Sequence, residues 1–178
     1  MTISNAKIMS QLEWESFTKK IYIKSKVENL YTLWTSSEGL TKWFLRDAEF
    51  KSSGGQVRQV SELTQQGDFY IWKWHNWDGQ EEGQVLQANG KDYIEITFSS
   101  CKVSVHLESK NNKTLVTLRQ FEIPTDSKSR LEIHQGCSNG WTFWLANLKA
   151  YIEYGVLLNE TEEDLRNISL SGYQFVNM

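Results

Sequence analysis

The spacing of apolar residues predicts a long helix near the C-terminal end of the chain, over residues 136–154. At about 100° per residue, one stripe of this helix carries two tryptophans and three aliphatic residues: Trp141, Trp144, Leu145, Leu148 and Ile152. Gly155 follows as a residue that tolerates the left-handed backbone at a helix end. Other positions are expected to face water, among them Asn147, Lys149, Ala150 and Glu153. Such a stripe needs a broad apolar partner.

The hundred residues before this helix predict that partner as an antiparallel sheet. Alternation with a period of two marks a first strand from Trp14, with one face made of Phe17, Lys19, Ile21 and Ile23. Further strand-like segments lie at 47–51, 68–77, 83–87, 93–99, 101–108 and 115–123, while 57–63 is ambiguous. The turn signals between them are Ser52–Gly55, Asp78-Gly79, Asn89-Gly90 and Asn111-Asn112. Successive hairpins make a meander with one covered face and one wet face.

Two short helices in tandem are predicted between the first two strands. Each follows a capping-box pattern, Ser25–Glu28 for the first and Thr35–Glu38 for the second. The apolar residues at helical spacing are Val27, Leu30, Tyr31 and Trp34, then Leu40, Trp43 and Phe44. A third such pattern, Ser129–Glu132, places the start of the long helix near 126–129. Its continuity past Gly136 and Gly140 stays open, because each glycine costs roughly 1 kcal/mol relative to alanine.

The length of 178 residues favours a single domain over 1–178, with a core at 14–155 and peripheral ends at 1–12 and 156–178. Eight tryptophans and 13% aromatic residues exclude disorder and imply a thick core or an aromatic-lined cavity. The first end has apolar residues for a short amphipathic turn: Ile3, Ile8, Met9 and Leu12. The second has scattered apolar anchors: Leu157, Leu158, Leu165, Ile168 and Leu170.

Charge and composition exclude several classes of partner. A net charge of −3 argues against a general affinity for nucleic acid or anionic membranes. The chain has nothing close to the roughly 18 apolar residues of a spanning helix, and residues 1–11 lack the apolar region of a signal peptide. Cys101 and Cys137 are too few for a disulfide framework in a chain this long. We therefore expect a cytoplasmic protein without membrane insertion.

Several segments resemble a known family. Ile21–Ser25, Val27–Thr35 and Gly39–Phe44 resemble the opening of START-like (SRPBCC) domains, and within these the family of the C-terminal domain of activators of the heat-shock protein 90 ATPase. Gly83–Leu86 with Ile94–Phe98 is similar to that family's central hairpin, and Gly140–Glu153 to its terminal helix. The resemblance covers roughly residues 14–155.

This resemblance implies an α+β helix-grip fold, in which a curved antiparallel sheet closes around the long C-terminal helix and two small helices seal one end. Family members often keep a hydrophobic cavity between helix and sheet and bind lipids, polyketides or other apolar ligands. Some relatives catalyse cyclisation or dehydration there, and the eukaryotic activators bind a chaperone. This chain departs from those activators in lacking their N-terminal chaperone-binding domain, which puts a full co-chaperone role in doubt.

Metal and nucleophile chemistry have little support in the sequence. His134 and Cys137 are three residues apart and could share a helix face, but a structural zinc needs four ligands at recognisable spacing. The spacing offers the pair no Asp or Asn to orient a catalytic base. We therefore expect no metal and no cofactor, with Cys137 partly buried and His134 at the surface. His106 alternates with apolar neighbours and is expected to point outward.

The aromatic residues make the stronger hypothesis. Tyr70, Trp72 and Trp74 share one strand face, and alternation admits only one of Arg119 and Gln120 to the interior. If the strand face meets the helix stripe, a ligand-binding lining results: Tyr70, Trp72, Trp74, Phe98, Gln120, Trp141, Trp144, Leu145 and Leu148. The alternatives are ordinary core packing, or a strand face that points outward and stacks on a partner.

Three functions follow from these alternatives. The first is a module that binds a hydrophobic or aromatic small molecule. The second is an enzyme in the same cavity, with polar groups such as Tyr70, Tyr93 or Gln120 as acid–base candidates, although the sequence carries no catalytic motif. The third is a protein-interaction module, such as a chaperone accessory. A continuous cavity of roughly 300 Å³ or more favours the first two, and a filled core with an exposed aromatic patch favours the third.

Overall fold

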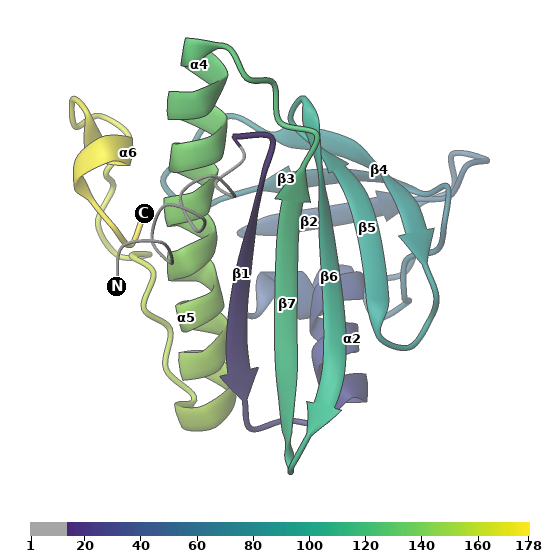
Figure 1. The fold of residues 1–178 in the computed structure, drawn as a ribbon. Coiled ribbons are helices and arrows are strands. Elements are labelled where there is room, and N and C mark those ends of the chain that lie inside the picture. The colour runs from purple at the N-terminus through teal and green to yellow at the C-terminus, as the bar shows by residue number, and fades with distance from the viewer. Residues whose placement is uncertain (1–13) are drawn as a thin grey trace, which may run out of the picture.

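The computed structural model describes residues 14–178, which form a curved antiparallel sheet folded against one long helix (Figure 1). In these residues the sheet has seven strands in the order β1-β7-β6-β5-β4-β3-β2. The strands are β1 Ser16–Ile23, β2 Asp47–Lys51, β3 Phe69–Lys73, β4 Glu81–Ala88, β5 Tyr93–Phe98, β6 Cys101–Lys110 and β7 Lys113–Phe121. Apart from β1, which pairs with β7, each strand follows its sequence neighbour, as a meander requires. The predicted helix-grip architecture is confirmed.

Two short helices, α2 Val27–Thr35 and α3 Ser37–Thr41, lie between β1 and β2 as predicted. Their caps differ from the predicted boxes. Lys26 occupies the cap of α2, and the Ser25 hydroxyl donates to the carbonyl of Lys26. Ser36, not Thr35, caps α3, and its Oγ accepts from the Gly39 N–H at 3.0 Å. Thr35 is the last residue of α2, and its hydroxyl donates to the carbonyl of Tyr31 one turn earlier.

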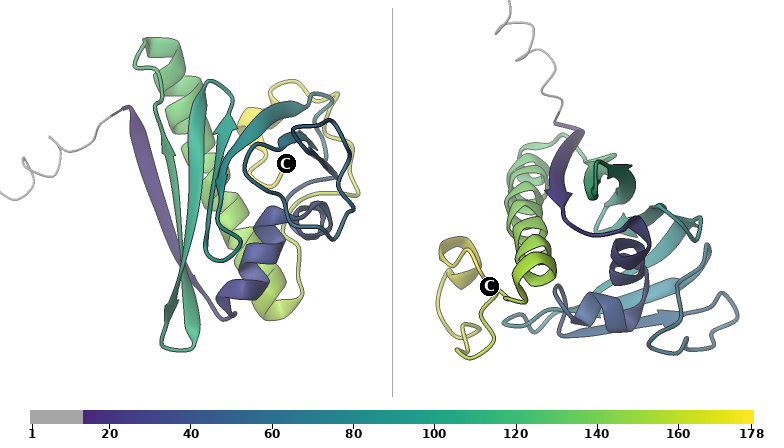
Figure 2. Two further views of the ribbon diagram at one scale, coloured as in Figure 1. Left: turned by 90° about the vertical axis from the view of Figure 1, so that its right-hand side faces the viewer. Right: turned by 90° about the horizontal axis from the view of Figure 1, so that it is seen from below.

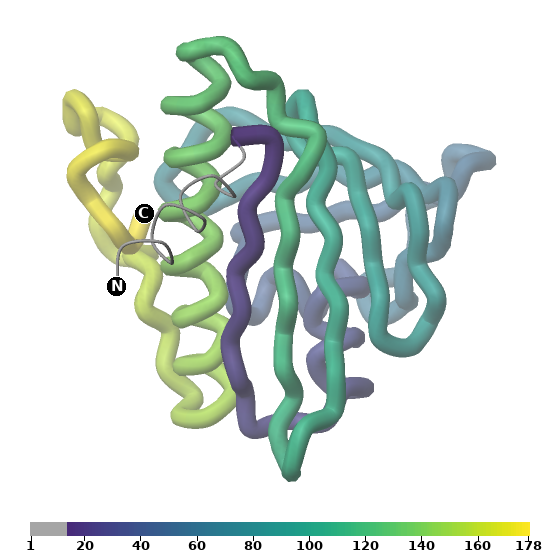
Figure 3. Tube along the Cα trace, in the orientation of Figure 1, coloured from purple at the N-terminus to yellow at the C-terminus, as the bar shows by residue number. Residues whose placement is uncertain are grey.

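The C-terminal helix is continuous through both glycines. Asp126 caps it, accepting from two backbone N–H groups at 3.1 Å each, so the predicted box at Ser129–Glu132 lies inside the helix. A single turn, α4 Ser127–Ser129, leads into a π-helical stretch, η1 Arg130–Cys137, and then into α5 Ser138–Tyr154. Figure 3 traces this unbroken course. It ends at Gly155, whose φ of 68° is the left-handed conformation expected there.

Turn chemistry accounts for the remaining differences in the strands. The Asn89-Gly90 turn forms, with Asn89 Oδ1 accepting from three backbone N–H groups. Asn111 and Asn112 both take positive φ in the β6–β7 hairpin. The segment 74–80 is instead a seven-residue loop, so Asp78-Gly79 is not a two-residue hairpin turn. The ambiguous segment 57–63 is a loop that touches β2 through a bridge between Lys51 and Val57.

The phase predicted for α5 is confirmed, with two exceptions on its polar side. Trp141, Leu145 and Leu148 are buried against the sheet. Asn147, expected in water, is fully buried. Glu153 is also covered, because its carboxylate accepts from the Lys24 N–H at 2.8 Å and from Lys149 Nζ at 2.6 Å. Lys149 Nζ in turn donates to the carbonyl of Tyr22 at 2.8 Å, so both side chains tie the helix to β1.

The tail, residues 156–178, runs back beside α5 on the side away from β1 and carries the short helix α6 Ser171–Gln174 (Figures 1 and 2). Among its five predicted anchors, Leu165 is buried and the others are exposed: Leu157, Leu158, Ile168 and Leu170. The expectations for residues 1–12 and for the missing signal peptide lie outside the described residues. In residues 14–178, the helices are too short or too polar to cross a membrane.

Candidate ligand-binding site

Phe44, which follows α3, is the centre of an aromatic cluster between α5 and the sheet. Its ring centroid lies 5.1 Å from that of Trp144 and 5.4 Å from that of Trp141, both on α5. On the sheet side it lies 5.7 Å from Trp72 and 5.4 Å from Trp74. Three of these four pairs are edge-to-face and the fourth is tilted, in keeping with the offset and edge-on arrangements that aromatic quadrupoles favour. The strand face of Tyr70, Trp72 and Trp74 therefore points inward, toward the helix.

Beside this cluster is an apolar space of about 180 Å³, called here the inner space. Its lining is Phe44, Trp74, Phe98, Cys137, Gly140, Trp141 and Trp144. The four helical members follow the spacing i, i+3, i+4 and i+7, so they form one stripe. The π-helical stretch ends at Cys137, at the edge of this space. Such irregular turns are frequent at functional sites, and here the turn precedes the residues that border the opening.

A larger cleft of about 730 Å³, the outer cleft, adjoins the inner space. Trp74, Gly140 and Trp144 line both. The β3–β4 loop adds two of its walls through His75 and Trp77, and α5 contributes residues between Asn139 and Ala146. The last wall comes from the tail: Gly172, Tyr173, Phe175, Val176 and Met178. A Cβ on Gly140 would meet no heavy atom of residues 14–178 within 4 Å other than those of its chain neighbours and its own helix backbone, so there is open space beside this residue, where the two spaces adjoin.

Gln120 is the inward member of the Arg119–Gln120 pair, and its polar atoms are used within the protein. It is fully buried, its Oε1 accepts from Trp141 Nε1 at 2.9 Å, and its Nε2 donates to Cys101 Sγ at 3.0 Å. Gln120 therefore fixes the Trp141 ring and does not itself line either space. Cys101 Sγ donates a hydrogen bond to the carbonyl of Phe98 at 3.0 Å, so this hydrogen-bond chain runs from Trp141 through Gln120 to a second lining residue.

Both thiols are poor nucleophiles in this setting. Burial raises the pKa of Cys101 to about 11 and also raises the pKa of Cys137. Each is thus protonated near neutral pH, and the thiolate is the reactive form. Burial likewise raises the pKa of Tyr70, whose hydroxyl donates to the carbonyl of Thr97 at 2.6 Å. Tyr93 bonds Glu95 on the opposite face of the sheet from Ile94, away from both spaces.

Of the nine predicted lining residues, four border the inner space: Trp74, Phe98, Trp141 and Trp144. Tyr70, Trp72, Leu145 and Leu148 pack behind them in the core. The sequence did not identify Phe44 as a lining residue, nor the tail residues that line the outer cleft. It also missed the glycine at the junction, although Gly140 sits on the same helical stripe as Trp144 and could have been found from that spacing.

His134 and Cys137 do not share a site. The His134 ring is half-buried against β1, with its centroid 5.0 Å from that of Trp14 and 5.4 Å from that of Phe17. Its Nε2 lies 3.3 Å from the carbonyl oxygen of Ser16. Cys137 faces the inner space instead. Among residues 14–178, no group of three or more His, Cys, Asp or Glu side chains is placed to hold a metal ion.

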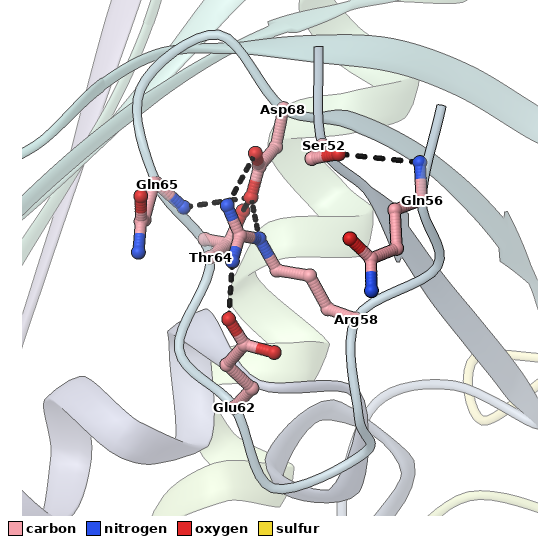
Figure 4. Close-up of polar contacts among 7 residues, drawn as sticks. All are labelled: Ser52, Gln56, Arg58, Glu62, Thr64, Gln65 and Asp68. Atoms are coloured by element: carbon pink, nitrogen blue, oxygen red, sulfur yellow. Dashed lines mark hydrogen bonds and ion pairs between the residues drawn. The ribbon is translucent and has the colours of Figure 1, made fainter. Parts of the chain in front are cut away.

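A buried ion pair lies elsewhere, in the loop between β2 and β3 (Figure 4). Arg58 binds Asp68 through two nitrogens, with Nη2 at 2.9 Å from Oδ1, and it also contacts Glu62. The Asp68 carboxylate further accepts from the Thr64 hydroxyl at 3.0 Å and the Gln65 N–H at 2.8 Å. Burial acts to raise the pKa of Asp68, but these hydrogen bonds outweigh it and lower the pKa overall. Because its charged groups are paired with one another, this cluster cross-links the loop between Arg58 and Asp68.

A curved antiparallel sheet that closes around one long C-terminal helix is the fold of a START-like domain. Residues 24–153 match the family described as activator of Hsp90 ATPase homolog 1-like protein, and the chain belongs to this family. A comparison with curated proteins gives no match.

Solved structures show the same fold at low identity. A protein from Staphylococcus saprophyticus is 17% identical with a TM-score of 0.65, and the match covers 80% of this chain and 95% of that protein. The Aha1 dimer from Colwellia psychrerythraea is 18% identical with a TM-score of 0.63, covering 79% and 97%. CalU16 from Micromonospora echinospora is 16% identical with a TM-score of 0.57, covering 79% and 77%.

Proposed function

We propose that this protein binds an apolar, aromatic small molecule in the inner space and the adjoining outer cleft. The observation that carries the proposal is an aromatic-lined space next to Phe44 that opens at Gly140. A flat ring inserted there would extend an array whose centroids already lie 5.1 to 5.7 Å apart. Stacked and edge-to-face aromatic pairs contribute about 0.5–1.5 kcal/mol beyond the area that they bury.

The size of the two spaces supports binding across both. The inner space, at about 180 Å³, is smaller than the roughly 300 Å³ at which ligand pockets begin. The outer cleft, at about 730 Å³, supplies the missing volume. The core behind them is filled by Tyr70, Trp72, Leu145 and Leu148, which restricts a ligand to the open edge of the helix–sheet interface.

Binding without catalysis suits the groups at the site. The thiol of Cys137 is held protonated, and Gln120 is engaged by Trp141 and Cys101. The Tyr70 hydroxyl donates a hydrogen bond to the backbone carbonyl of Thr97. None of these three offers a free acid or base to a substrate in the inner space.

The test is a titration with the neutral fluorophore N-phenyl-1-naphthylamine. We expect saturable binding with a change in tryptophan emission. Gly140→Leu should weaken binding at least about tenfold, or 1.4 kcal/mol, because its side chain fills the junction. Its stability should not fall, since leucine is the better helix former.

Two control variants separate this effect from a general one. Gly140→Ala adds only a methyl group and should bind within about twofold of the unaltered protein. Tyr154→Ala removes an exposed aromatic from the same helix, outside both spaces, and should not matter. The proposal fails if the fluorophore shows no saturable binding, or if Gly140→Leu binds as well as Gly140→Ala.

A further inference from the structure

We propose that the tail, residues 156–178, is the outer wall of this ligand site, and that the ligand is elongated, with an aromatic end in the inner space and a hydrogen-bonding end in the outer cleft. This inference rests on the proposed function. The tail lies beyond the range 24–153 that matches the family.

Two buried asparagines hold the tail in place, and we call them the asparagine latch. Asn147 of α5 accepts from the Leu158 N–H at 2.6 Å and donates to Asn159 Oδ1 at 3.2 Å. It also donates to the carbonyl of Trp43 at 2.5 Å. Its side chain thus connects the tail to the segment that carries Phe44. Unmet amide groups at such a buried position are costly, so the tail is fixed there.

Asn76 is the second half of the latch. It lies in the β3–β4 loop, in the left-handed conformation with a φ of 55°. Its Nδ2 donates to the carbonyl of Glu160 at 3.1 Å, and its Oδ1 accepts from the Leu165 N–H at 2.9 Å. The loop that carries Trp74 and Trp77 and the helix that carries Trp144 are therefore each tied to the tail.

Beyond the latch, the tail surrounds a space instead of filling it. Tyr173 and Val176 are 83% and 82% exposed, although both border the outer cleft. Phe175 borders the same cleft, which is also lined by the aromatic side chains of Trp77 and Phe143. Apolar groups gathered around a cavity and left in water gain free energy when a ligand covers them, at about 25 cal/mol per Å².

The chemistry of the two spaces differs, and that difference sets the ligand class. The inner space is bordered by aromatic rings, a glycine and a protonated thiol. The outer cleft adds the polar side chains of His75, Asn139 and Thr142. A molecule that occupies both meets stacking surfaces at one end and hydrogen-bonding groups at the other. A small apolar compound would use the inner end alone.

Two probes separate these ends. N-phenyl-1-naphthylamine is short and apolar, and 11-(dansylamino)undecanoic acid has an aromatic group joined by a long chain to a carboxylate. They are titrated into the full chain, into a chain ending at Leu170, and into the full-length variant Tyr173→Ser/Phe175→Ser/Val176→Ser. We expect both altered proteins to lose at least about tenfold in affinity for the long probe and less than about twofold for the short one.

The triple variant keeps the measurement decisive if the shortened chain fails to fold, because its three side chains are partly or largely exposed. Unchanged binding of the long probe by that variant overturns the inference and leaves the proposed function standing. Tighter binding by the shortened chain also overturns it, since the tail would then be a plug. Saturable binding of neither probe by the full chain removes the proposed function itself.

Self-association is the competing use of these exposed side chains. Light scattering coupled to size-exclusion chromatography should give the molar mass of a monomer for the full chain, both with and without the long probe. A dimer that the triple variant abolishes would assign Tyr173, Phe175 and Val176 to a contact between two copies and would overturn the inference.

Discussion

The indole N–H of Trp141 donates to the side-chain oxygen of Gln120, 2.9 Å away, in a fully buried contact between α5 and β7. This bond fixes the rotation of a tryptophan that borders the inner space and packs on both Phe44 and Phe98. A polar residue on the covered face of the sheet thus positions an aromatic one on the helix. The orientation of the Trp141 ring beside the inner space therefore depends on Gln120.

Gln120→Leu should lower the free energy of unfolding by about 1–3 kcal/mol, because it leaves a buried indole N–H unsatisfied. Urea denaturation measures the change. In the Trp141→Phe background the same substitution should cost clearly less, since both polar partners are then gone. Equal costs in the two backgrounds would show that the bond contributes nothing to stability.

Leu148→Ala should cost about 2–5 kcal/mol, because this side chain is fully buried between α5 and the sheet. The matched control is Leu157→Ala in the tail, where the leucine is exposed and the change should stay within about half a kcal/mol. Thermal unfolding of both variants gives the comparison. A loss below about half a kcal/mol for Leu148→Ala would mean that its site is peripheral.

Arg58→Ala should destabilise the protein by roughly 3 kcal/mol, since it leaves the Asp68 carboxylate buried without its main partner. Lys42→Ala breaks an exposed i,i+4 ion pair with Glu38 and should change stability by less than about 0.5 kcal/mol. If the two substitutions cost the same in urea denaturation, the loop cluster is no stronger than a surface pair.

The ion pair also predicts a pH dependence. The pKa of Asp68 is lower in the folded protein than its unfolded value of about 3.9. Between those two values the unfolded chain binds more protons, so stability rises with pH. The contribution of Asp68 is therefore complete above about pH 3.9 and is lost as the pH falls through the folded value. Asp68→Asn should flatten this part of the stability–pH curve; an unchanged slope would contradict the assignment.

The elements with a clear period were predictable, and the contacts between them were less so. Alternation at Tyr70, Trp72 and Trp74 showed that they share a face, and the stripe on α5 gave its phase. Which rings border open space depends on how side chains from separate elements pack together in three dimensions. That is why Phe44, in the turn after a short helix, was missed as a lining residue although it contacts five other aromatic rings.

Polar residues gave the clearest errors. Asn147 and Glu153 were expected in water because polar groups on a helix usually lie there. Their partners are backbone N–H groups of the tail and of Lys24, just after β1, and no periodic pattern signals either. The cap at Asp126 lay within the predicted start of the helix, since an aspartate in that position offers its own acceptor to the first turn.

Lys149 and Glu153 have one more consequence, which concerns the border of the sheet. Strand β1 is outermost, and its free backbone groups would offer a template on which a strand of another molecule could add. These two side chains, one helical turn apart, bond the carbonyl of Tyr22 and the N–H of Lys24. The helix thereby occupies two of the backbone groups with which a neighbouring strand would pair at this end of β1, so a strand adding there would have to break both bonds.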